Sequence, residues 1–193
     1  YKNGDYIGSK KYQVNEDTQI YLAKLAKKVC KMKYVMGVNP CSEVNILLLG
    51  AYCVIADVIP YHADTLDEAE DALRATVRAL IRVNLMDCLY AKEVARTNRI
   101  GVGLTGIHEF AWKFFEMSFK DLIDEEKSKE FWNTITRFSR AVSDEAEKYS
   151  KYIGVVTPHT SLIMKPSGTI AKLFGVTEGY HLASMIAYLR WVQ

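Results

Sequence analysis

The chain has 193 residues, of which 49% are hydrophobic and 25% charged, and its formal net charge is +2. This composition is typical of a globular protein with room for one ordinary core, and it excludes a disordered chain. The near balance of 25 basic and 23 acidic side chains gives no reason to expect a nucleic-acid or anionic-membrane partner.

No segment predicts membrane insertion or export. The longest apolar run, residues 46–56, is about half as long as a membrane span. The start, Tyr1-Lys2-Asn3-Gly4, is not a signal peptide, so we expect a cytoplasmic protein. Because the first residue is not methionine and the last residues lie inside an expected strand, we also expect a fragment of a longer chain.

Helical and extended patterns alternate along the sequence, which predicts an α/β fold with mainly parallel strands. Apolar spacing and branched residues predict helices over 18–32, 107–116 and 125–149, and strands over 46–49, 52–59, 153–157, 161–164 and 185–192. The capping box Thr65-Leu66-Asp67-Glu68 opens a long helix. Its expected buried stripe is Leu66, Ala69, Leu73, Val77, Leu80, Ile81, Leu85, Cys88 and Leu89.

The stretch Asn39-Pro40-Cys41-Ser42-Glu43 carries an amide, a thiol and a carboxylate at alternate positions. Pro40 excludes a regular helix here, and in an extended segment alternate side chains share one face. We therefore expect a short finger that presents these three groups in a row.

The four cysteines, Cys30, Cys41, Cys53 and Cys88, form no C-x-x-C pair, which argues against a zinc ribbon or a thioredoxin-like motif. They are either buried apolar residues or catalytic ones, and the helical positions of Cys30 and Cys88 favour packing. The four histidines lie far apart without ligand spacing, so no metal site is predicted.

Two further motifs each have two interpretations. Gly101-Val102-Gly103-Leu104-Thr105-Gly106 matches a dinucleotide fingerprint, but a helical polar run precedes it, where a true fingerprint follows a buried strand. The alternative is a short strand with a close backbone contact. Lys165-Pro166-Ser167-Gly168-Thr169 is either an ordinary turn or, if a helix follows, an anion pocket of amides and hydroxyls.

Together, the 39–43 finger, the 97–106 segment and the 165–169 turn resemble three motifs of the ribonucleotide reductases, in the same order. The amino-acid sequences of the turn and of Tyr52-Cys53-Val54-Ile55 are most similar to those of the adenosylcobalamin-dependent (class II) triphosphate reductases. The resemblance implies a ten-stranded α/β barrel threaded by a central finger loop. Residues 1–193 would form a single, partial barrel domain, with the finger at 38–45 and the phosphate turn at 165–169.

The resemblance also implies roles. Cys41 would form the thiyl radical, Glu43 would act as general base, and Asn39 would hold the ribose. Cys53 would be one half of the redox-active disulfide, paired with a cysteine outside this chain. Ser167, Gly168 and Thr169 would bind the substrate phosphates.

The implied cofactor is adenosylcobalamin, and the implied substrate is a ribonucleoside triphosphate or diphosphate. A thioredoxin-type reductant and dNTP or ATP effectors are the implied partners, and the fragment alone should be inactive. Two other functions stay open: a nucleotide-linked dehydrogenase that uses residues 101–106, and a non-catalytic helical interaction module in which Cys41 is merely buried.

Overall fold

The computed structural model describes residues 20, 21, 24, 36–38, 45–47, 54–89, 91–159 and 161–180. The first three of these are helical, within the helix predicted over 18–32. The elements that follow are β1 (Met36–Val38), β2 (Asn45–Leu47), β3 (Val54–Val58), the 3-10 helix η1 (Pro60–His62), α2 (Leu66–Val83), α3 (Ala91–Thr97), β4 (Ile100–Leu104), α4 (Ile107–Phe115), α5 (Phe119–Leu122), α6 (Lys129–Ile153) and α7 (Ile170–Leu173).

Strands β3 and β4 form a parallel pair, in register from Val54 opposite Ile100 to Val58 opposite Leu104. On the other edge of β4, Leu162 makes a parallel bridge with Val102. The predicted α/β class with parallel strands is therefore confirmed for this part of the chain. Strands β1 and β2 form a separate antiparallel pair.

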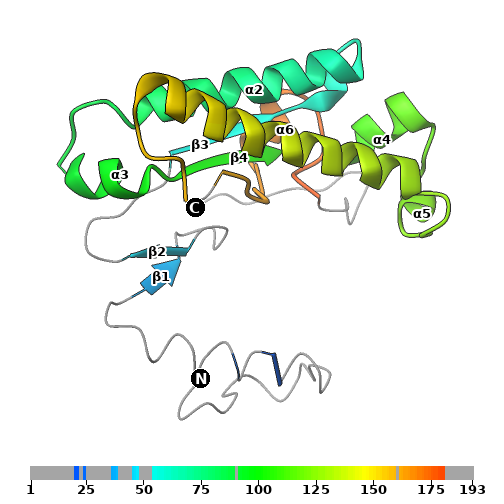
Figure 1. Ribbon diagram of the computed structural model, residues 1–193. Coiled ribbons are helices and arrows are strands. Elements are labelled where there is room, and N and C mark those ends of the chain that lie inside the picture. The colour runs from blue at the N-terminus through cyan, green and yellow to red at the C-terminus, as the bar shows by residue number, and fades with distance from the viewer. Residues whose placement is uncertain are drawn as a thin grey trace.

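Helices α2 and α6 lie side by side over one face of the parallel pair (Figure 1). The apolar residues of β4 that face them, Ile100, Val102 and Leu104, are buried. They join one core with the buried stripes of the two helices, which include Leu73, Val77, Ile81, Phe131, Phe138, Val142 and Ala146. Five of the predicted stripe positions of α2 are fully buried, and Leu66 is half-buried.

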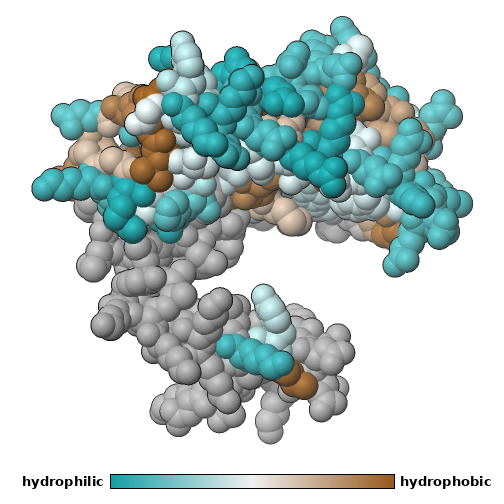
Figure 2. Space-filling view, in the orientation of Figure 1, coloured by the Kyte–Doolittle hydropathy of each residue, from teal (hydrophilic) through white to brown (hydrophobic). Residues whose placement is uncertain are grey.

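The outward faces of α2 and α6 are mainly hydrophilic (Figure 2). Ion pairs join the two helices: Arg137 contacts both Asp67 and Glu70, and Arg78 contacts the buried carboxylate of Glu145 at 2.5 Å.

The capping box sets the start of α2 as predicted. The Thr65 hydroxyl oxygen accepts a hydrogen bond from the Glu68 amide at 3.1 Å. The Glu68 carboxylate accepts from the Asp64 amide at 2.7 Å, one residue earlier than in the ideal box.

The end of α2 differs from the prediction. The helix stops at Val83, and Leu85 and Leu89 are exposed by 57% and 88%, so they are not part of a buried stripe. Cys88 is half-buried. The cause is tertiary: the buried Asn84 side chain donates hydrogen bonds to the Asn98 side chain and the Arg99 carbonyl, both at 2.9 Å.

Three other predicted elements differ from those in the structure. The helix predicted over 125–149 begins later, at Lys129, because the Asp124 carboxylate holds a turn by accepting from the Glu126 and Lys127 amides. It continues to Ile153 and ends at Gly154 (φ +75°), so the strand predicted over 153–157 is wrong. The strand predicted over 161–164 is reduced to the bridge at Leu162. The strand predicted over 185–192 lies outside the described residues.

Candidate active site

The candidate phosphate turn leaves the sheet at its carboxyl edge. β3, β4 and the segment around Leu162 run parallel, and the turn at 165–169 comes directly after the third of these. In open α/β sheets ligands bind at this edge, beyond the ends of the strands. The turn therefore lies where the architecture favours a ligand.

Within the turn, Ser167 is the strained residue. Its φ is +56°, which is uncommon for a residue with a side chain, and it is 3% exposed. Its carbonyl accepts from the Ala171 amide at 2.9 Å, whereas its buried hydroxyl has no hydrogen-bond partner among the described residues. The amides of Gly168, Thr169 and Ile170 also donate to no described residue.

Gly168 has space beside it in the part of the chain that the structure describes. There, a Cβ built on it would meet only the Glu178 carboxylate, at 3.9 Å. Glu178 is itself paired with Lys172 on α7, at 3.2 Å. The turn is thus followed by one cation and one anion that largely offset each other.

Glu109 of α4 fixes the loop that carries Glu178. Its carboxylate accepts from the Thr177 amide at 2.9 Å and from the Thr177 hydroxyl at 2.7 Å. The Gly106 amide donates to the Thr177 carbonyl at 3.0 Å. Nearby, burial raises the pKa of Tyr180 above its ordinary value.

One further pair of residues at this edge was not predicted from the sequence. The side chain of Asp57, on β3, is 1% exposed and lies 3.0 Å from the ammonium of Lys165, the first residue of the turn. A signal was present, because Asp57 is the one charged residue in the strand Val54–Val58. A charge in a buried strand requires a partner.

The glycine motif is a strand and not a dinucleotide loop. Gly101 and Gly103 lie inside β4, and both are buried. In a dinucleotide fingerprint the glycines follow the strand and cradle the pyrophosphate. Here a Cβ on Gly101 would lie 2.8 Å from the end of the Ile163 side chain, so the glycine permits close packing between strands. The structure favours the second interpretation of this motif.

The finger residues Asn39, Cys41 and Glu43, like Cys53, lie outside the described residues. The strands that flank the finger are described: β1 ends at Val38, which pairs with Asn45 at the start of β2. An antiparallel pair brings the two ends of the intervening segment together.

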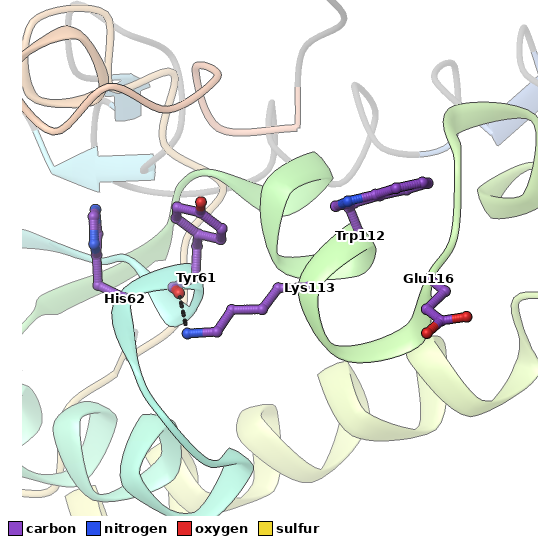
Figure 3. A pocket seen from close by; sticks show the side chains of 5 residues that line it. All are labelled: Tyr61, His62, Trp112, Lys113 and Glu116. Atoms are coloured by element: carbon purple, nitrogen blue, oxygen red, sulfur yellow. Dashed lines mark hydrogen bonds between the residues drawn. The ribbon is translucent and has the colours of Figure 1, made fainter.

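A separate hollow of about 730 Å³ lies between η1 and α4 (Figure 3). Tyr61, His62, Trp112, Lys113 and Glu116 line it, and none of them was predicted as a site residue. The Lys113 ammonium donates to the carbonyls of Tyr61 at 3.0 Å and Ala63 at 2.6 Å, so it ties α4 to η1.

Among the described residues, no three His, Cys, Asp or Glu side chains converge as metal ligands. None of the helices described is both long and apolar enough to cross a membrane.

Comparison with known proteins gives a consistent result. The chain is 32% identical over 166 residues to the adenosylcobalamin-dependent ribonucleoside-triphosphate reductase of Lactobacillus gasseri. It is 32% identical over 164 residues to the protein of that name in Levilactobacillus brevis. Each match covers 76% of this chain and 22% of the relative, so the chain spans about a fifth of the length of these relatives. No protein-family model matches the chain.

A solved structure shows the same fold. The crystal structure of a B12-dependent (class II) ribonucleotide reductase superposes with a TM-score of 0.64, at 24% identity, over 75% of this chain and 22% of that one. The described arrangement of helices around a small parallel sheet is therefore that of a part of this reductase. The chain is a homologue of one segment of the adenosylcobalamin-dependent ribonucleotide reductases, as its three motifs predicted.

Proposed function

We propose that this chain is part of the catalytic chain of a ribonucleotide reductase, which reduces ribonucleoside triphosphates to deoxyribonucleotides for DNA synthesis. The observation that carries the proposal is the 32% identity to ribonucleoside-triphosphate reductases over three quarters of the chain. The turn at the carboxyl edge of the sheet supports it, because free amides and a buried hydroxyl suit a phosphate.

The finger residues perform the chemistry on the ribose. Cys41, as a thiyl radical, abstracts the hydrogen atom from the 3′ carbon, and its S–H bond is close enough in strength to that C–H bond for the step to be reversible. Glu43 takes the proton of the 3′ hydroxyl as general base. Asn39 donates a hydrogen bond that fixes the ribose oxygen.

Cys53 supplies reducing equivalents. Reduction at the 2′ carbon needs two electrons, and a dithiol that closes to a disulfide releases two electrons and two protons. The 2′ hydroxyl then leaves as water. Cys53 pairs for this purpose with a cysteine outside this chain, and a thioredoxin-type reductant reopens the disulfide.

The turn holds the substrate by its phosphates. The amides of Gly168 and Thr169 and the Ser167 hydroxyl donate to phosphate oxygens, and the strained backbone at Ser167 keeps these donors aimed at the ligand. The ribose is thereby placed at a fixed distance from the finger.

The radical source is adenosylcobalamin, the cofactor named for the relatives. Its corrin ring holds the cobalt, so a protein contributes a wide cavity rather than a set of metal ligands. Among the described residues, no group of side chains identifies a corrin site.

The proposed function includes a larger barrel architecture. Residues 1–193 form part of a ten-stranded barrel, with the finger at 38–45 inside it and the phosphate turn at 165–169 on its rim. Binding of dNTP or ATP effectors and a cytoplasmic location complete the proposal.

The decisive test is an assay of the full-length protein for deoxyribonucleotide formation, with a dithiol reductant and with or without adenosylcobalamin. We expect product from ribonucleoside triphosphates only when the cofactor is present. Cofactor-independent turnover would contradict the cobalamin assignment, and no turnover with any ribonucleotide would contradict the proposed function.

A further inference from the structure

We propose that the buried ion pair between Asp57 and Lys165, seated against Gly103, positions the phosphate turn at 165–169 and so sets the affinity for the substrate triphosphate. The inference rests on the proposed function, because it concerns the same turn. Asp57 and Lys165 are positioning residues in this proposal, and the amides of the turn contact the ligand.

Asp57, Gly103 and Lys165 lie on one face of three parallel segments. Asp57 is directly opposite Gly103 in the register of β3 and β4. A Cβ on Gly103 would lie 2.9 Å from the Lys165 Cβ and 3.0 Å from Asp57 Oδ1. The absent side chain therefore creates the space in which the carboxylate and the lysine stem meet across β4.

Two residues earlier the same face is apolar. A Cβ on Gly101 would lie 2.8 Å from Ile163 Cδ1 and 3.1 Å from Ile55 Cγ1. Because side chains alternate along a strand, Ile100, Val102 and Leu104 occupy the opposite face, in the core beneath α2 and α6. The ion pair thus lies on the face of the sheet away from that helical layer.

The buried carboxylate of Asp57 depends on Lys165 for charge compensation. Asp57 Oδ2 is 3.0 Å from the Lys165 ammonium, and Asp57 Oδ1 has no hydrogen-bond partner among the described residues. Lys165 is the one cationic partner of Asp57 among the residues described. A buried carboxylate that loses such a partner is left uncompensated, so the backbone around it must rearrange or admit water.

The position of Lys165 in the chain transmits this constraint to the turn. Lys165 precedes Ser167 by two residues, and at the other end of the turn the Thr169 carbonyl accepts from the Leu173 amide at 3.2 Å. The turn is therefore held at both ends while its central residue has a φ of +56°. If the Lys165 anchor is released, Ser167 can relax and the amides of residues 168–170 lose their common direction.

The test is a steady-state comparison in the full-length protein with a ribonucleoside triphosphate as substrate. We expect Lys165→Met to raise KM about ten-fold or more, because a small displacement of a binding group is costly. Lys165→Arg keeps the charge and should restore part of the affinity. A merely structural role would instead lower the active fraction, and therefore kcat, with KM unchanged.

A glycine pair gives the matched control. Gly103→Ala pushes on both members of the ion pair, and Gly101→Ala introduces an equally close contact, but with the flexible end of Ile163. We expect a raised KM for the first variant only. This comparison also tests the positioning role of the ion pair if Lys165→Met fails to fold. Equal KM values for the two alanine variants would overturn the inference.

A direct binding measurement separates this inference from the proposed function. If the unmodified protein reduces no ribonucleotide, the proposed function fails. Titration calorimetry with inorganic tripolyphosphate then tests the turn alone. Binding that weakens in Lys165→Met, and does not in the helix-pair control Arg78→Met, supports the positioning role. Binding that is equal in the two variants, or absent from the unmodified protein, overturns it.

Discussion

The two faces of the β3–β4 pair are built for different purposes. Towards α2 and α6, β4 presents the large side chains of Ile100, Val102 and Leu104, which are at most 4% exposed and fill the core. On the other face, β4 presents Gly101 and Gly103, and its neighbouring segments supply an ion pair. One strand thus stabilises the domain with its even-numbered residues and leaves space with its odd-numbered ones.

This division separates stability from function within five residues of sequence. Substitutions on the helical face should act on the free energy of unfolding, since they remove buried apolar area or leave a cavity. Substitutions on the glycine face, in the turn and in the finger should act on KM or kcat. The following experiments test that separation, starting with the largest expected effect.

Cys41→Ser should abolish ribonucleotide reduction in the full-length protein. The O–H bond of serine is too strong for reversible hydrogen-atom transfer, so turnover should be lost. Because serine has nearly the same size as cysteine, the free energy of unfolding should change little. Deoxyribonucleotide formation and chemical denaturation measured on the same sample check both statements. Substantial turnover by this variant would remove Cys41 from the radical role.

Phe138→Ala should lower the free energy of unfolding by about 3–5 kcal/mol without changing KM. Phe138 is 1% exposed on the helical face, and its ring centroid lies 5.8 Å from that of Phe110. Denaturant titration measures the loss. Tyr152→Ala on the same helix is the control, because Tyr152 is 81% exposed and its loss should cost about 0.5 kcal/mol or less. A raised KM for Phe138→Ala would show that the two faces are not independent.

Gly168→Val should raise KM for a ribonucleoside triphosphate about 100-fold, with little effect on stability. The fold leaves room at this position, since the nearest atom to a Cβ is 3.9 Å away, so the valine should obstruct the phosphate and not the protein. Ser167→Ala removes a single hydrogen bond and should cost only about 1 kcal/mol. Similar small effects for the two variants would make 165–169 an ordinary turn.

Glu145→Gln should change the pH dependence of stability and leave the kinetics alone. The hydrogen bond from the Arg78 guanidinium lowers the pKa of Glu145 below 4.5, and the carboxylate is buried between α2 and α6. The pair therefore stabilises the folded state fully above about pH 4.5, and this contribution is lost as the pH falls through the lowered pKa. Thermal unfolding at pH 7 and pH 3 should show a smaller difference for the variant than for the unmodified chain.

The control for this experiment is Glu147→Gln, on the same helix. The pKa of Glu147 is also lowered, by Lys151, but its side chain is 58% exposed, so solvent weakens the pair. An equally large change of pH dependence in both variants would contradict the assignment to the buried contact.

The sequence by itself determined the elements that local chemistry fixes. The hydroxyl of Thr65 and the carboxylate of Glu68 set the start of α2, apolar spacing placed the buried faces of α2 and α6, and alternating glycines predicted a short strand at β4. The order of three motifs predicted the similarity to the adenosylcobalamin-dependent ribonucleotide reductases. The roles of Asn39, Cys41, Glu43 and Cys53 stay predictions, because these residues lie outside the described ones.

Only the tertiary structure decided where α2 ends, where α6 begins and what Asp57 does. The hydrogen bonds of Asn84 join residues 14 and 15 positions apart, and the ion pair of Asp57 joins residues 108 positions apart. Periodicity reports which side of an element is apolar, but it carries no information about which distant group satisfies a buried polar atom. The sequence does not indicate which residue pairs with Asp57, because a carboxylate buried in a sheet is neutralised by the cation that the tertiary fold places beside it.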